Sequence, residues 1–167
     1  MVSKTLVSDA AADKDASFTF TVTLGDNSIN GTYGDMTFAN GMATVTLKGG
    51  ESATATGLPT DITYTVTEEE TAGFVLTGKT GDTGVISTTP SEAKFTNTRE
   101  TGDLTVSKTV VSDAAADKNA SFTFTVTLGD NSINGTYGDM TFADGKATFT
   151  LKDGESATAT GLPTDIT

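Results

Sequence analysis

Histidine, cysteine, tryptophan and glutamine are absent from this sequence of 167 residues. Without cysteine the chain can form no disulfide and offers no thiol nucleophile, and without histidine it has no imidazole base. The usual zinc sites built from these two residue types are excluded as well. These absences remove the working residues of most familiar enzyme classes, and they leave the cellular compartment open.

Basic residues and long apolar runs are also scarce. Only 10 Lys and Arg stand against 22 Asp and Glu, which gives a formal net charge of −12. Such a charge repels nucleic acid and anionic membrane surfaces, so we expect neither as a partner. No apolar run approaches the roughly 20 residues that span a bilayer, and no signal-peptide pattern follows Met1. We therefore expect the sequence to be a piece of a longer protein, without its signal or anchor.

Threonine and glycine are abundant instead, with 36 and 18 residues respectively. Threonine favours strands because its branched side chain packs well on a pleated surface, and glycine favours turns. This composition is typical of short strands joined by turns and not of helices. We therefore predict an all-β fold.

One long segment of the sequence occurs twice. Residues 2–63 return without a gap as residues 106–167, an offset of 104, and six of the 62 positions differ. A period of this length is the size of an independent domain and exceeds the roughly 20 to 50 residues of a solenoid unit. We predict a complete domain over residues 1–100 and the N-terminal part of a second, near-identical domain over residues 101–167. Neighbouring repeats of the same polypeptide are the expected partners. The six differences are Leu6/Val110, Asp15/Asn119, Asn40/Asp144, Met42/Lys146, Val45/Phe149 and Gly49/Asp153.

Alternating apolar and polar residues mark the strands. Over residues 18–24 apolar side chains alternate with threonine, which is typical of a half-buried strand. The pair Asn40-Gly41 predicts a tight hairpin, and Asp144-Gly145 repeats it. Further strands are expected at about residues 2–8, 36–38, 43–47, 51–57, 62–68, 73–78, 83–88 and 93–98, with one helical turn at residues 10–14. So many short strands in one repeat predict an immunoglobulin-like β-sandwich, and the two repeats in tandem give one complete and one truncated sandwich.

Three polar residues fall on apolar faces of these strands. Because side chains at positions i and i+2 share a face, Lys4 groups with the apolar residues of the first strand, Glu68 with those of the 62–68 strand, and Asn97 with those of the last strand. Each of them alone could reach solvent at a strand end. The three together are explained more simply as mutual partners in a buried site. In the second repeat the same rule groups Leu104, Val106, Lys108 and Val110 on one face.

Such a site could form a covalent bond. Burial penalises charge, so it favours the neutral amine of Lys4 and the protonated carboxyl of Glu68. The amine could then attack the side-chain carbonyl carbon of Asn97, while Glu68 polarises that carbonyl and passes a proton to the departing ammonia. The predicted product is an intramolecular isopeptide bond between Lys4 and Asn97. Because this reaction happens once per chain, we predict that the protein is not an enzyme, and we expect no cofactor and no metal.

Four short strings resemble the isopeptide-forming domains of Gram-positive pilins and adhesin stalks, including the streptococcal major-pilin and Cna-B-like groups. The resemblance implies a structural stalk or spacer repeat of a surface adhesin or pilus, outside the cell at the bacterial cell wall. It also implies a Lys4–Asn97 crosslink assisted by Glu68. Lys108 matches the family's lysine in the second repeat, where the sequence contains no corresponding glutamate or asparagine. The four strings are residues 104–108 (LTVSK), 18–22 (FTFTV), 64–68 (YTVTE) and 95–98 (FTNT).

The polar loop at residues 25–35 motivates a second hypothesis, a ligand-binding adhesin module. Its Asp and Asn side chains could supply oxygen ligands to calcium or contact a glycan. The loop lacks the residue order of an EF-hand, and Asp, Asn and Gly are common in any long turn. The sequence does not identify a host ligand.

A third hypothesis concerns the incomplete second repeat. Its predicted strands would have open edges, and open edges invite pairing with another chain. Residues 64–99 of one copy could in principle complete the second repeat of another by strand swapping. Self-association would be the consequence of this hypothesis. We favour the ordinary order, in which residues 64–99 complete the first repeat, because Lys4 belongs to that repeat.

Overall fold

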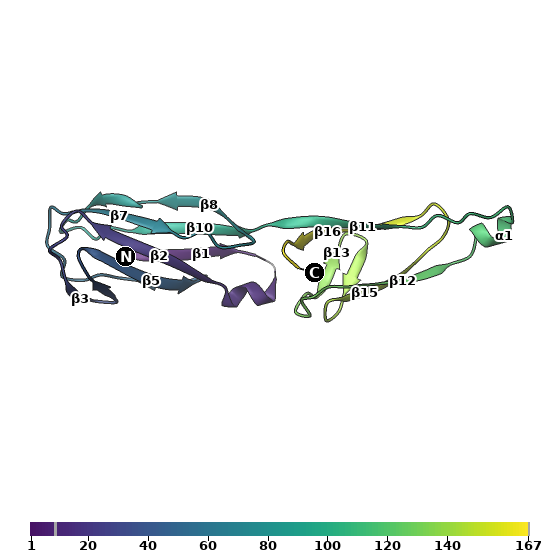
Figure 1. The fold of residues 1–167 in the computed structure, drawn as a ribbon, viewed down its shortest axis with the longest axis horizontal. Coiled ribbons are helices and arrows are strands. Elements are labelled where there is room, and N and C mark those ends of the chain that lie inside the picture. The colour runs from purple at the N-terminus through teal and green to yellow at the C-terminus, as the bar shows by residue number, and fades with distance from the viewer. Residues whose placement is uncertain (9, 167) are drawn as a thin grey trace. The chain divides into compact units, whose positions relative to one another are not determined.

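The all-β prediction is confirmed by the computed structural model, which describes residues 1–8 and 10–166. The chain divides into two compact units, Met1–Arg99 and Glu100–Thr167 (Figure 1). Strands dominate both units, and each unit contains one short helical turn. In the described part of the chain, none of the helices has the length and apolar character of a membrane span.

The first sheet of the first unit joins the beginning and the end of that unit. Its strands are β1 (Val2–Val7), β6 (Ser52–Ala53), β8 (Phe74–Thr80) and β10 (Ala93–Arg99). They are ordered β6-β1-β10-β8, and β1 runs parallel to β10 while the other neighbours are antiparallel. The register sets Lys4 opposite Phe95 and Leu6 opposite Asn97. Residues more than ninety positions apart therefore lie on adjacent strands.

The second sheet of the first unit is antiparallel throughout. Its strands are β2 (Ser17–Leu24), β5 (Met42–Lys48), β7 (Thr63–Glu68) and β9 (Thr83–Val85). They are ordered β5-β2-β7-β9, and Phe20 of β2 lies opposite Glu68 at the end of β7. The predicted alternation is confirmed in β2, where Phe18, Phe20, Val22 and Leu24 are all buried.

Phenylalanine rings fill the core between these two sheets. The Phe20 ring meets the Phe95 ring edge-on at 5.1 Å between centroids, and Phe18 meets Phe74 in the same way at 5.3 Å. Edge-to-face contacts of this kind are the favoured aromatic geometry. They hold β2 of one sheet against β8 and β10 of the other.

The predicted hairpin turn is confirmed in both repeats. Strand β3 (Gly31–Tyr33) pairs with β4 (Met36–Phe38), and β4 leads through Asn40-Gly41 into β5. Both turn residues have positive φ, 51° and 73°, as a type I′ turn requires. In the second repeat Asp144 and Gly145 have φ of 49° and 71°. The same backbone thus accepts Asn or Asp at the first turn position.

The second unit repeats this pattern with fewer strands. Its elements are β11 (Thr101–Ser107), α1 (Ala115–Lys118), β12 (Phe122–Thr127), β13 (Gly135–Tyr137), β14 (Met140–Phe142), β15 (Lys146–Leu151) and β16 (Ser156–Pro163). They form three two-stranded sheets, β11-β16, β12-β15 and β13-β14. Within the described residues of this unit, β12 has no neighbour in the place that β7 takes beside β2.

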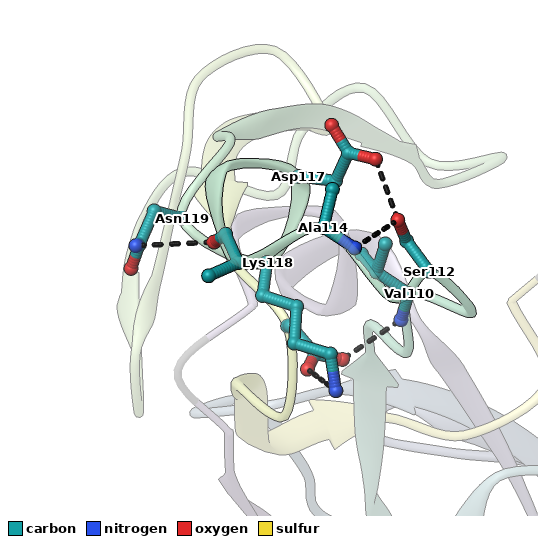
Figure 2. A network of polar contacts seen from close by, with 8 residues as sticks. Val110, Ser112, Ala114, Asp117, Lys118 and Asn119 are labelled. Carbon is teal, nitrogen blue, oxygen red and sulfur yellow. Dashed lines mark hydrogen bonds and ion pairs between the residues drawn. The ribbon is translucent and has the colours of Figure 1, made fainter.

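A helical turn follows the first strand in each repeat. In the first unit it is a 3-10 turn, η1 (Ala11–Asp15), close to the predicted residues 10–14. In the second unit it is α1, where Ser112 accepts a hydrogen bond from the Ala114 amide and donates one to Asp117 (Figure 2). This serine-centred network fixes the start of the turn.

Three expected strand lengths were wrong, and one of them is the strand expected at about residues 83–88, which covers only Thr83–Val85. The strand expected at residues 51–57 is only Ser52–Ala53, whereas the equivalent strand of the second repeat, β16, continues to Pro163. Strand β1 begins at Val2 and reaches only these two residues of β6, whereas β11 begins earlier in its repeat and pairs along β16. The first strand of the second repeat was expected to include Lys108 and Val110. It ends earlier, because β11 stops at Ser107, which lies opposite the first residue of β16.

Candidate functional site

Lys4 lies in the core of the first unit. It is the fourth residue of the chain, in β1, and only 2% of its surface is exposed. The strand alternation explains this placement, because Lys4 shares the inward face of β1 with Val2, which is also buried. The structure therefore places a lysine where an aliphatic residue would ordinarily lie.

Glu68 reaches Lys4 from the facing sheet. It is the last residue of β7, and its Oε1 accepts a hydrogen bond from Lys4 Nζ at 2.6 Å. The side chains of Lys4 and Glu68 are 0% and 3% exposed. Removing both charges from water costs free energy. The attraction between them offsets this cost only when their geometry is good.

Asn97 lies beside Lys4 on the adjacent strand of the first sheet. Lys4 is opposite Phe95 in the parallel register of β1 and β10, and Asn97 is two residues further along β10. Phe95 and Asn97 are both buried, at 2% and 3% exposure, so they share the inward face. Diagonal neighbours of this kind lie within reach of long side chains. The structure thus brings all three predicted site residues into one region of the core.

Two aromatic rings surround the Lys4 ammonium. Nζ lies 3.9 Å from the centroid of the Phe18 ring and 5.9 Å from that of Phe20. The face of an aromatic ring attracts a cation, and the rings also exclude water from the amine. The alternation over residues 18–24 indicates that both rings point inward, but it does not indicate that they pack against the lysine.

Two oxygen atoms of this site have no hydrogen-bond partner within the described part of the chain. They are Glu68 Oε2 and Asn97 Oδ1, and both are buried. A buried acceptor without a donor costs about 1 to 3 kcal/mol. A carboxylate oxygen and an amide carbonyl oxygen are both acceptors, so neither can serve as a donor to the other.

Burial lowers the pKa of Lys4 below its ordinary value of 10.5. The hydrogen bond and the negative charge of Glu68 act in the opposite direction and only partly offset this effect. Desolvation therefore prevails, and it favours the neutral amine that a nucleophile requires.

Lys108 of the second repeat keeps part of this environment. Its Nζ lies 4.4 Å from the centroid of the Phe122 ring, which is the counterpart of Phe18. Unlike Lys4 it is half-buried, and it follows the end of β11. The printed sequence carries no counterpart of Glu68 or Asn97 in this repeat.

A second buried charge near the end of β10 was not predicted. Asp13 in η1 is 8% exposed, and its Oδ2 lies 3.6 Å from Nε of Arg99. The Arg99 guanidinium lies 5.0 Å from the centroid of the Phe74 ring. The contact ties the helical turn to the last strand. The alternation of side chains along a strand cannot predict the contact between Asp13 and Arg99, because Asp13 lies in η1 and not in a strand.

The segment at residues 25–35, expected to be a polar loop, contains strand β3, and its polar side chains bind backbone amides nearby. Asp26 Oδ1 accepts a hydrogen bond from the Ser28 amide, and Asn30 Oδ1 accepts one from the Asn40 amide. The hydrogen bond with Ser28 lowers the pKa of the Asp26 carboxyl. Across residues 1–8 and 10–166, no group of three or more acidic side chains is placed to hold a metal ion.

A family model matches both units. It is described as "Domain of unknown function (DUF7601)", and it matches residues 1–99 and again residues 102–167. Among curated proteins, the pilus tip adhesin Cpa of Streptococcus pyogenes is 49% identical over 60 residues. The match covers 32% of this chain and 9% of that protein, so the chain spans less than a tenth of that relative's length.

Solved structures with a similar fold include streptococcal pilins. The major pilin from Streptococcus pyogenes matches with a TM-score of 0.57 and 23% identity, covering 99% of this chain and 77% of the pilin. The T-13 major pilin of the same species matches with a TM-score of 0.52 and 18% identity over the same shares. These matches concern the fold. The predicted immunoglobulin-like sandwich and the predicted resemblance to Gram-positive pilus proteins are confirmed.

Proposed function

This chain belongs to the DUF7601 domain family, and from that premise we propose that it is a structural stalk repeat of a Gram-positive surface adhesin or pilus, with an isopeptide bond between Lys4 and Asn97. The 49% identity with a pilus tip adhesin over 60 residues supports the surface role. Residues 1–100 form one complete module in this proposal, and residues 101–167 begin the next. The location is outside the cell, at the cell wall.

The observation that carries the proposal is the buried set of Lys4, Glu68 and Asn97. Lys4 and Asn97 lie on adjacent strands of one sheet, and Glu68 lies within hydrogen-bond distance of Lys4 from the other. Two acceptors of the set are buried and unsatisfied. A structural ion pair would not require an asparagine with an unbonded carbonyl oxygen, whereas an amide-forming site would.

The bond forms by exchange of one amide for another. The neutral Nζ of Lys4 attacks Cγ of Asn97, the N–C bond forms, and the bond from Cγ to the side-chain NH₂ breaks. A proton on Glu68 Oε2 is donated to Oδ1 of Asn97, which polarises the carbonyl and relieves both unsatisfied oxygens. Glu68 then moves a proton from the attacking nitrogen to the leaving group, and as ammonia departs the proton on Oδ1 returns to Glu68. Glu68 ends in the state in which it began.

Only the folded unit brings the three groups together. Fixed orientation of reacting groups can lower a barrier by about 7 to 11 kcal/mol. The Phe18 ring near Nζ helps to exclude water, and this desolvation lowers the pKa of Lys4. The fold itself therefore supplies the catalysis, and each chain reacts once.

The position of the bond suits a load-bearing module. Lys4 is in β1 and Asn97 in β10, which are the first and last strands of the first unit and run parallel. Tension applied to the two ends of the unit would pass through the covalent bond and bypass the residues between. A crosslink over a loop of about this length also stabilises a domain by roughly 4 to 5 kcal/mol, through the same restriction of the unfolded chain as a disulfide.

The test is the intact mass of the purified chain. We expect a deficit equal to one ammonia molecule, and a crosslinked Lys4–Asn97 peptide after digestion. Glu68→Ala and Lys4→Ala should each restore the full mass. Lys108→Ala is the matched control, because it removes the equivalent lysine of the second repeat and should leave the deficit unchanged. A full mass in the unaltered chain would overturn the isopeptide proposal.

A further inference from the structure

An unfilled apolar groove lies at the N-terminal end of β1 in the first unit. A cavity of about 320 Å³ is present there. Its apolar lining includes Val2, Leu24, Met36, Leu58, Tyr64 and Val66. Ala55 and Gly57 also line it. Within the described residues, no strand pairs with positions 54–59.

The second unit shows what occupies the equivalent place. Positions 54–59 correspond to 158–163, which belong to β16, and β11 lies along them. The register pairs Thr101 with Pro163, Gly102 with Leu162, and Leu104 with Ala159. Residues 54–59 and 158–163, which we call the acceptor segments, have identical sequences. The same acceptor is thus filled in one repeat and open in the other.

Leu104 stands at the position whose equivalent, just before residue 1, would face this cavity in the first unit. Leu104 itself is 38% exposed in the second unit, where the lining residues Tyr64 and Val66 have no counterparts. It lies two residues before Val106, on the same face, and Val106 is the counterpart of Val2. Val2 is 3% exposed and lines the cavity. A leucine placed directly before residue 1 would therefore project into the apolar space. Its backbone partner would be Ala55, which is half-buried, whereas the counterpart Ala159 is 0% exposed.

The open acceptor already has the conformation of the filled one. Gly57 has φ of 78° and its counterpart Gly161 has 74°. The Thr54 amide donates to Asp35 Oδ2 at 2.9 Å, and the Thr158 amide donates to Asp139 in the same way at 2.9 Å. Binding a strand here would require little rearrangement, which favours affinity.

On its other side, the start of the chain already makes backbone hydrogen bonds with residues at and just before the beginning of β10. The Met1 carbonyl accepts a hydrogen bond from the Ala93 amide, and the Met1 nitrogen donates to the Ser91 carbonyl at 2.8 Å. Desolvation lowers the pKa of this terminal ammonium. A neutral peptide amide in the same place would make the bond to Ser91 without carrying a charge into the groove.

We infer that this groove binds an extended linker strand of the Thr101–Thr105 type, supplied by a preceding repeat, with its leucine anchored in the cavity. The linker then belongs structurally to the repeat that follows it. In an array, each junction would be a paired strand and not a free tether. The inference does not depend on the isopeptide bond, because none of its contacts involves Lys4, Glu68 or Asn97.

The test adds the segment Glu-Thr-Gly-Asp-Leu-Thr in place of Met1, directly before Val2, in the full chain. In the second unit the Gly161 amide donates to Asp103 Oδ1 at 3.0 Å, so the Gly57 amide should gain the equivalent acceptor. We expect its hydrogen exchange to slow by about tenfold or more. NMR should also show contacts between the added leucine methyls and the side chains of Leu24 and Met36.

The matched control carries the same extension with aspartate in place of leucine. It keeps the length and the backbone, and it should lose both the protection of Gly57 and the methyl contacts. Equal exchange rates for Gly57 with and without the leucine extension, together with no methyl contact to the cavity, would overturn the inference. The mass deficit serves as an independent readout, so failure of this proposal and failure of the isopeptide proposal are distinguishable.

Discussion

Lys4 is held in the core by a balance of opposing effects on its charge. Burial disfavours the ammonium, and Glu68 together with the Phe18 ring favours it. The pKa of Lys4 falls, so desolvation is the larger effect. The unsatisfied oxygens of Glu68 and Asn97 add a cost of about 1 to 3 kcal/mol each. The free energy of the site without a crosslink is therefore raised, and the proposed Lys4–Asn97 bond would lower it.

The charge state of Lys4 gives a prediction about pH. In a Glu68→Gln, Asn97→Ala background no bond forms, and the effects of Glu68 that raise the Lys4 pKa are removed. Between the lowered pKa and 10.5 the unfolded chain binds more protons than the folded one, so the free energy of unfolding rises with pH over that window. Relative to the same background with Lys4→Met, the stability deficit should shrink as pH rises toward 10.5. Urea unfolding of both variants at several pH values measures this, and a deficit that is independent of pH would contradict it.

Removal of Asn97 gives a prediction about stability. Asn97→Ala prevents the crosslink and should lower the free energy of unfolding of the first unit by roughly 4 to 5 kcal/mol. Denaturant unfolding followed by NMR signals of β2 measures the change. The Lys108→Ala chain serves as control, since it leaves the first unit intact. A loss no larger than that of one hydrogen bond, about 1 kcal/mol, would argue against a covalent bond in the unaltered chain.

At the scale of the element, strand identity could be predicted and strand length could not. Alternation located β2 because each inward position is apolar, and Asn40-Gly41 located the hairpin because both residues accept positive φ. The lengths of β6 and β16 differ although their sequences are the same, because the partner strand begins at a different point in each repeat. The spacing of Lys4, Glu68 and Asn97 from their apolar neighbours likewise predicts that all three lie on apolar strand faces. The partnership of Asp13 with Arg99 depends on tertiary placement and was not.

One difference between the repeats gives a prediction about β1. A Cβ atom added at Gly49 would lie 2.8 Å from Leu6 Cβ, too close for an undisturbed strand. In the second repeat Asp153 takes this position, and its Oδ1 accepts a hydrogen bond from the Val110 amide beyond the end of β11. Gly49→Asp should therefore displace the end of β1 and lower the free energy of unfolding by about 1 to 3 kcal/mol.

Asp15→Asn is the matched control for this substitution, because it also imports a residue of the second repeat. It removes an exposed ion pair with Lys48, so the unfolding midpoint should stay the same. Urea unfolding of the two variants compares them directly. Equal midpoints for Gly49→Asp and the unaltered chain would show that β1 tolerates the added side chain.

At the scale of the whole molecule, the two units place one sequence in two strand environments. Residues 17–24 and 121–128 are identical, but β2 pairs with both β5 and β7, whereas β12 pairs with β15 on one side. The core rings follow this difference. Phe18 and Phe20 are 0% exposed, and their counterparts Phe122 and Phe124 are half-buried. The two segments have the same sequence, so the difference in burial of these rings comes from the neighbouring strands.

This arrangement predicts unequal hydrogen exchange in identical sequences. Intrinsic exchange rates are matched, so protection reports the strand neighbours alone. Amides of β12 that correspond to the β7-bound amides of β2 should exchange at least about tenfold faster, because opening them requires no loss of a second strand. Amides between β12 and β15 serve as the internal control, since that pairing also exists between β2 and β5. NMR-detected exchange resolves the two copies. Equal protection of β2 and β12 would mean that a second chain covers the open edge, and sedimentation at several concentrations would then show association.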